Sequence, residues 1–235
     1  MGLPKINLPL FELKLPSSGE TVKFRPFTVK EEKFLLIAQE SDDSKARLLA
    51  IRQIVNNCCV DLPTDIGKLP SFDLEYCFIK IRSKSVGNEL ELAYRDKTDN
   101  RIYEFVVDLD ELEVAFNPEH KNTFPITDTL GVVMGYPTIE QLAEMNLDLD
   151  KDPAGILELV KACISSIYDE ETVYETKDYS DKELDEFIES LPLDSFDAFT
   201  RFFETMPVLR HELHYKDKDG TEKTITLEGI DDFFQ

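Results

Sequence analysis

One short segment occurs twice in the chain and constrains the fold more than any other feature. It reads ELAYRDK at residues 91–97 and ELHYKDK at residues 212–218. Each copy is followed by a short polar turn and by a second run in which apolar and polar residues alternate. Alternation on both sides of a turn rich in Gly, Asn and Asp is typical of a β-hairpin. The sequence therefore predicts two similar hairpins.

A similar helix opening precedes each hairpin, LPSFD at residues 69–73 and LPLDSFD at residues 191–197. The same order of elements, met twice, favours an internal duplication, and two unrelated hairpins with similar polar edges are the alternative. In a duplicated chain, the polar segment NPEHKN, residues 117–122, would lie between the two copies.

We therefore expect an α+β fold of tandem hairpin–helices–hairpin units, with antiparallel hairpins packed on helices. The first unit, residues 1–117, would contain a hairpin, three helices and a hairpin. The second unit, residues 118–235, would contain strands, four helices and a hairpin. The two units could also form one compact pseudo-symmetric body.

The first half opens with alternation between residues 11 and 24, which predicts a hairpin. Thr28 and Glu31 have the spacing of a capping box and predict a helix start. Two further helices, the first repeated hairpin and a strand complete this half. The expected buried positions are Phe34, Ile37 and Ala38 in the first helix, Leu48, Ile51, Val55 and Cys58 in the second, and Leu74, Phe78 and Ile81 in the third, with a strand within residues 111–116.

The second half is expected to begin with short strands over residues 124–134. Thr138 with Gln141, and Ser180 with Glu183, form two more capping boxes. The most regular helix follows Pro153. Its expected apolar stripe is Ile156, Leu159, Val160, Cys163, Ile164 and Ile167. A last helix would begin at Ser195 and end at Pro207.

Composition limits the partners of the chain. Of 235 residues, 42% are hydrophobic and 16 are Phe, which is enough for a real core. The formal net charge of −22 argues against binding to nucleic acid or to an anionic membrane surface. It suits either a basic protein partner or simply a strongly solvated surface. No apolar run is long enough for a membrane span, and the sequence opens without a signal-peptide pattern.

No metal site is expected. Asp148, Asp150 and Asp152 have the spacing of a calcium loop, but Pro153 replaces the required glycine, so a solvated acidic linker is the favoured interpretation. The three histidines are also unsuitable. His211 and His214 would point to opposite faces of a strand, and His120 is the remaining one.

No catalytic residue and no cofactor site are predicted either. The sequence has no glycine-rich phosphate loop and no nucleophile elbow. The cysteines have neither metal-knuckle nor disulfide-framework spacing and fit a reducing cytoplasm best: Cys58, Cys59, Cys77 and Cys163. We therefore expect no small-molecule substrate.

Two aromatic residues, Phe233 and Phe234, are the candidate partner-binding residues. They either fold back onto the chain or act as apolar anchors at an interface, where aromatic side chains supply much of the binding energy.

Several longer segments resemble a known family. The run from Phe11 to Lys33 resembles the opening of T-even-type phage baseplate hub proteins. The resemblance continues in the same order through FDLEY (72–76), RSKSVG (82–87), FNPEH (116–120), GVVM (131–134), FETMPVLRH (203–211) and LEGIDDFF (227–234).

This resemblance implies a non-enzymatic viral tail protein that acts in assembly of the baseplate central hub, as an assembly chaperone or as a hub component. A permanent structural subunit of the baseplate is the alternative, and a tail-associated hydrolase is a more remote one. The implied partners are other hub or tail proteins. The implied location is the host cytoplasm during phage assembly, or the baseplate of the virion tail.

This sequence departs from the family pattern in the two hairpin turns. In the family, the two hairpin turns often hold paired cysteines like those of a zinc ribbon. Residues 95–101 and 216–221 contain no cysteine here, so the metal role is not transferred. The hairpins are then expected to be held by packing alone.

Overall fold

The computed structural model describes residues 6–39, 44–145 and 153–233. The chain forms two compact units, one of Met1–Ala115 with Val208–Gln235 and one of Phe116–Pro207. The first unit is thus discontinuous, because the strand that begins at Val208 returns to pair with the strand that ends at Ala115. This division differs from the expected boundaries 1–117 and 118–235, since the second repeated hairpin joins the first unit.

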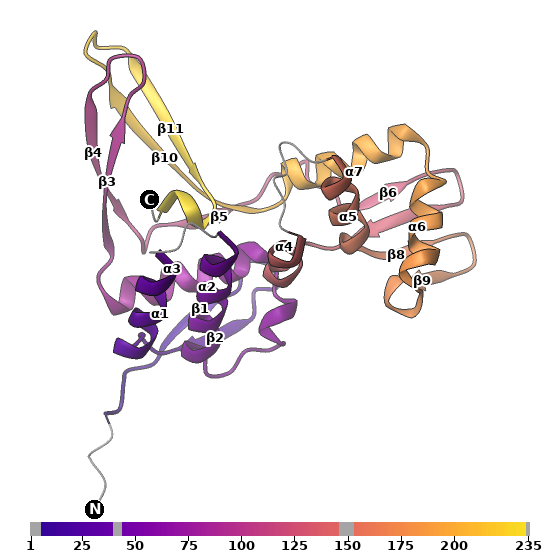
Figure 1. Cartoon of the computed structure of the whole chain (residues 1–235), viewed down its shortest axis with the longest axis horizontal. Coiled ribbons are helices and arrows are strands. Elements are labelled where there is room, and N and C mark those ends of the chain that lie inside the picture. Colours follow the sequence, from indigo (N-terminus) through magenta and orange to yellow (C-terminus); the bar gives the residue numbers. More distant parts are fainter. Residues whose placement is uncertain (1–5, 40–43, 146–152, 234–235) are drawn as a thin grey trace, which may run out of the picture. The chain divides into compact units, whose positions relative to one another are not determined.

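The first unit contains the first hairpin, three helices and both repeated hairpins (Figure 1). Its elements are β1 (Phe11–Lys14), β2 (Thr21–Phe24), α1 (Val29–Gln39), α2 (Ser44–Cys58), η1 (Ile66–Lys68), α3 (Ser71–Ser85), β3 (Glu89–Arg95), β4 (Ile102–Asp108), β5 (Glu113–Ala115), β10 (Val208–Lys216), β11 (Glu222–Glu228) and η3 (Ile230–Phe233).

The second unit is a small sheet packed on helices. Its elements are β6 (Thr123–Pro125), β7 (Gly131–Met134), α4 (Ile139–Met145), α5 (Pro153–Cys163), β8 (Ile164–Tyr168), β9 (Val173–Glu175), η2 (Thr176–Asp178), α6 (Asp181–Glu189) and α7 (Leu193–Thr205). The strand order is β6-β7-β8-β9, and every pairing is antiparallel. Small antiparallel sheets packed on helices confirm the α+β class.

Helix α3 is the centre of the first unit. Its apolar side chains are buried on nearly all sides, which a helix allows only when other elements surround it. The expected core residues Leu74, Phe78 and Ile81 are confirmed as fully buried. Strands β5 and β10 pack on this helix. Both stretches of the discontinuous unit therefore share one core.

Helix α1 differs from the expectation. Thr28 and Glu31 begin it as predicted, because the backbone N–H of Thr28 donates to Glu31 at 2.9 Å. The expected apolar stripe is wrong, however, since Phe34 and Ile37 are exposed. Among the side chains of this helix whose burial the structure describes, Glu31 is the most deeply buried.

The second unit has its own apolar core. The buried residues are Val132, Met134, Leu159, Val160, Cys163, Ile164, Ile188, Phe199 and Phe202. The capping boxes at Thr138 and Ser180 are confirmed by their hydrogen bonds.

One helix of this unit is shorter than expected. Helix α5 ends at Cys163, and Ile164 and Ile167 belong to strand β8. The expectation that Ile164 and Ile167 continue the apolar stripe of this helix is therefore wrong. The segment after Cys163 pairs with β7 on one side and β9 on the other, so its burial follows a strand period.

Candidate interaction surfaces

The two repeated hairpins meet at their turns. The carboxylate of Asp96, which opens the β3–β4 turn, accepts hydrogen bonds from the Tyr215 hydroxyl at 2.9 Å and from Lys223 Nζ at 2.7 Å. Tyr215 lies on β10 and Lys223 on β11, so these bonds join one hairpin to the other. Figure 1 shows the two hairpins side by side.

The contacts follow the sequence repeat. Asp96 and Asp217 occupy the same position in the two copies, and so do Tyr94 and Tyr215. Lys223 lies 2.7 Å from Asp96 and 3.6 Å from Asp217, so one ammonium group pairs with both aspartates. The repeat is therefore also a contact between its own copies, within one unit.

Aromatic rings of the two hairpins also contact one another beside this polar cluster. The ring centroid of Tyr215 lies 4.4 Å from that of Tyr103, 6.0 Å from Phe105 and 6.2 Å from Tyr94. Pairs at these separations contribute about 0.5–1.5 kcal/mol each beyond their area burial. The aromatic contacts and the ion pair together hold the two hairpins against each other.

Asp96 is the electrostatic centre of the contact. Its side chain is almost fully covered, and hydrogen bonds from Lys223 and Thr98 hold its pKa well below the usual range. The expectation that packing alone holds the hairpins is therefore corrected. An ion pair and hydrogen bonds bind the turns that have no cysteine.

Helix α1 offers an apolar surface. Val29 is 87% exposed, Leu36 53% and Ile37 59%, and Phe34 is partly exposed beside them. Lys30 and Lys33 of the same helix are also exposed. Several large apolar side chains gathered on one helix are typical of an interaction surface. We call these four apolar residues the α1 face.

A network of charged hydrogen bonds anchors the start of the helix that carries the α1 face. Arg25, just after β2, donates from Nη2 to Glu31 Oε1 at 3.1 Å and to the carbonyl oxygen of Asn57 at 3.0 Å. Burial alone would raise the pKa of Glu31, but hydrogen bonds from Arg25 and Thr28 outweigh it and hold the pKa at about 2. This charge-assisted network fixes the start of α1 against the end of α2.

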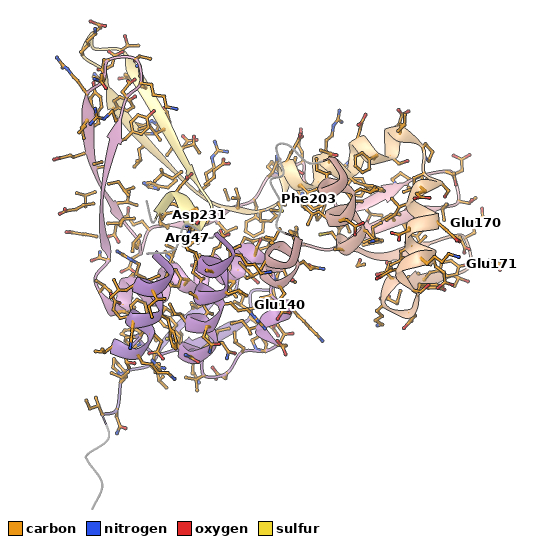
Figure 2. All side chains as sticks on the ribbon, in the orientation of Figure 1. Arg47, Glu140, Glu170, Glu171, Phe203 and Asp231 are labelled. Atoms are coloured by element: carbon orange, nitrogen blue, oxygen red, sulfur yellow. The ribbon has the colours of Figure 1, made fainter. Side chains whose placement is uncertain are left out.

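Phe233 is buried, with no exposed surface. It closes the short helix η3, and Asp231 of the same turn pairs with Arg47 of α2 at 3.5 Å (Figure 2). Of the two alternatives for Phe233, folding back onto the chain is the one observed, since its ring belongs to the core of the first unit. Phe234 lies outside the described residues, and its partner role stays a prediction.

Comparison with known proteins identifies the family of this chain. A family model described as T4 bacteriophage base plate protein matches residues 8–235, almost the whole chain. The chain belongs to this family. No curated protein and no solved structure matches it.

The residues considered for metal binding in this baseplate protein are scattered. His120 stacks on Tyr136 in the second unit, whereas His214 bonds Thr224 on the repeated hairpin. Asp148, Asp150 and Asp152 lie outside the described residues. Among the residues that the structure describes, no group of three or more His, Cys, Asp and Glu is placed to hold a metal ion.

The cysteines of the baseplate protein are free thiols. Burial raises the pKa of Cys58 and of Cys163 to about 12, which keeps both protonated and unreactive. Over the described ranges, no helix combines the length and the apolar character that crossing a membrane requires.

Sequence reasoning missed the Asp96–Lys223 pair and the α1 face. The first had a signal in the sequence, because an aspartate follows the tyrosine by two residues in both copies of the repeat. The second had none, because apolar residues at helical spacing suggest a buried stripe whether or not a neighbour covers them.

Proposed function

We propose that this baseplate protein is a non-enzymatic assembly factor of the baseplate central hub, acting as an assembly chaperone or as a hub component. The observation that carries the proposal is the family match over residues 8–235. The α1 face supports it, because a protein that acts by association needs an exposed apolar surface. Its partners are other hub or tail proteins, met first in the host cytoplasm.

A permanent structural subunit of the tail is the alternative within this class. The two roles differ in one measurable property, which is the presence of the protein in the finished particle. Quantitative mass spectrometry of purified virions, compared with infected-cell lysate, separates them. Absence from virions supports a chaperone, whereas a fixed copy number per tail supports a subunit.

The more remote alternative, a tail-associated hydrolase, has one observation in its favour. Glu75 has a pKa raised to about 8 by burial and by the neighbouring charge of Asp231. A carboxyl group of raised pKa beside a second carboxylate is the arrangement that glycoside hydrolysis uses. Here, however, Glu75 accepts the backbone N–H of Ile230, and Asp231 pairs with Arg47. Both groups therefore already hold the last turn of the chain, which favours a structural role.

The assembly role is tested by complementation of phage that lack this protein. Leu36→Ser combined with Ile37→Ser alters the α1 face, and Val60→Ser changes an exposed apolar residue elsewhere in the same unit. We expect the double variant to weaken association about tenfold, a loss of about 1.4 kcal/mol, and thereby to lower the yield of complete baseplates, counted by electron microscopy, at unchanged melting temperature. Normal baseplates in phage that lack the protein altogether would contradict the proposal.

A further inference from the structure

A pocket of about 460 Å³ lies between the β8–β9 hairpin and helix α6 of the second unit. Aromatic side chains form much of its wall: Tyr174 from β9, Tyr179 after η2 and Phe187 from α6. The rings of Tyr174 and Tyr179 meet edge to face, with centroids 6.3 Å apart. Tyr179 remains 41% exposed, so its ring is accessible to a ligand.

Three carboxylates also line this pocket: Asp169, Glu183 and Glu186. Asp169 accepts hydrogen bonds from the Tyr174 hydroxyl at 2.7 Å and from the backbone N–H of Thr172 at 2.8 Å. These bonds, that of Tyr174 above all, lower the pKa of Asp169, which keeps it negatively charged. Among the described residues that line the pocket, none is a lysine or an arginine.

The surroundings strengthen this negative field. Residues 164–189 contain ten Asp and Glu but two Lys. Glu170 and Glu171 lie at the β8–β9 turn (Figure 2). The whole second unit, residues 116–207, contains 21 Asp and Glu against 6 Lys and Arg, a net charge of −15 out of the chain's −22.

Lys182 forms a weak ion pair with Glu186 at the rim of the pocket. Lys182 lies 3.3 Å from Glu186, one helical turn away, and both side chains are largely exposed. Exposed pairs of this kind contribute about 0.3–0.5 kcal/mol. An incoming cation can therefore replace Lys182 at little cost.

We propose that this pocket binds an arginine side chain from a basic segment of a partner protein. A guanidinium group stacks on aromatic rings and pairs with carboxylates, and its apolar stem packs against aliphatic walls such as those of Ile167 and Leu184. The pocket volume admits such a side chain. The proposal rests on the assembly role only in naming a baseplate protein as the source of that segment.

The test uses the full chain and a capped peptide, acetyl-Gly-Arg-Gly-amide, with its neutral citrulline analogue as the matched probe. Binding is followed by the NMR signals of the tyrosine rings and by titration calorimetry. We expect the arginine peptide to shift the Tyr174 and Tyr179 signals and to bind at least fivefold more tightly than the citrulline peptide.

Two variants locate the site. Tyr179→Leu removes an aromatic face but keeps an apolar side chain, and Glu186→Gln removes one rim charge. Each is expected to weaken arginine binding at least threefold, whereas Glu189→Gln, on the same helix but outside the pocket, is expected to leave it unchanged. Thermal unfolding of every variant checks that the fold is intact.

Three outcomes would overturn the proposal. Equal binding of the two peptides would indicate an apolar ligand instead. Equal weakening by Glu189→Gln and Glu186→Gln would indicate diffuse attraction to an acidic surface. Concentration-dependent association of the protein that Tyr179→Leu abolishes would make a second copy the occupant, for example through Lys30 or Lys33. None of these results bears on the complementation test, so the two proposals can fail separately.

Discussion

Lys223 Nζ on strand β11 lies 2.7 Å from Asp96 Oδ2 at the start of the β3–β4 turn. Two hairpins that are more than a hundred residues apart in the sequence are thereby joined at their turns. This ion pair acts together with the ring contacts of Tyr215 to hold the two hairpins against each other.

Replacing Asp96 by Ala is expected to loosen both hairpin turns. The change removes the acceptor for Tyr215 and Lys223, so amide hydrogen exchange near residues 96–101 and 217–221 is expected to accelerate by about tenfold. Lys223→Met should have a smaller effect in the Asp96→Ala background than in the unchanged protein, because only its contacts with Asp217 and Thr98 are then left to lose. Lys216→Met, which breaks the exposed pair with Glu222, is the control and should change exchange far less. Equal effects of Lys216→Met and Asp96→Ala would contradict the assignment.

Glu75→Gln is expected to stabilise the protein at alkaline pH. The pKa of Glu75 is raised to about 8 by burial, whereas an unfolded chain has about 4.3. Between these values the folded state holds a proton that the unfolded state has lost, so this group destabilises the fold as pH rises from about 4.3 to 8.

The glutamine keeps the oxygen that accepts the Ile230 N–H but carries no charge. At pH 8.5 we expect a gain of about 1–2 kcal/mol in free energy of unfolding, since Glu75 is only partly covered, and almost none at pH 4. Urea unfolding at both pH values measures it, with Glu20→Gln in the exposed β1–β2 turn as the control. A gain of the same size at both pH values would rule out titration of Glu75 as the cause.

Ile164→Asp is expected to destabilise the second unit severely. Ile164 begins β8 and is buried in that unit's core, so an unpaired carboxylate there costs about 3 kcal/mol or more. Chemical denaturation measures the loss. Val173→Asp on the exposed side of β9 is the matched control and should cost less than about 1 kcal/mol. An unchanged unfolding midpoint for Ile164→Asp would place the residue outside the core.

Phe233→Ala is expected to lower the melting temperature of the first unit. The ring is fully buried, and loss of a buried Phe side chain costs about 3–5 kcal/mol. Differential scanning calorimetry measures this. Phe234→Ala separates the anchor role from the core role, because it leaves Phe233 in place. A Phe233→Ala protein that melts normally would show that the ring is not part of the core.

Local patterns predicted much of the fold. Residue pairs at fixed spacing, such as Ser180 with Glu183, marked helix starts correctly, because a capping box is made within four residues. The repeated hairpins were also recognised, since alternation and turn composition are local properties.

Properties that depend on distant segments could not be read in the same way. The partner of β10 is β5, and nothing near Val208 specifies that pairing. Ile164 continues the helical stripe of α5, yet it lies on a strand, because pairing with β7 outweighs the local period. The pocket beside Tyr179 required the fold, since its walls come from β8, β9 and α6.

The discontinuity of the first unit sets an order of events during synthesis. Residues 116–207 leave the ribosome before β10 exists, so the second unit can fold while strand β5 and helix α3 still lack their partner. The core around α3 stays incomplete until β10 emerges. A nascent chain of this protein therefore exposes the apolar surface around α3 until β10 and β11 have emerged, and docking of that hairpin completes the first unit.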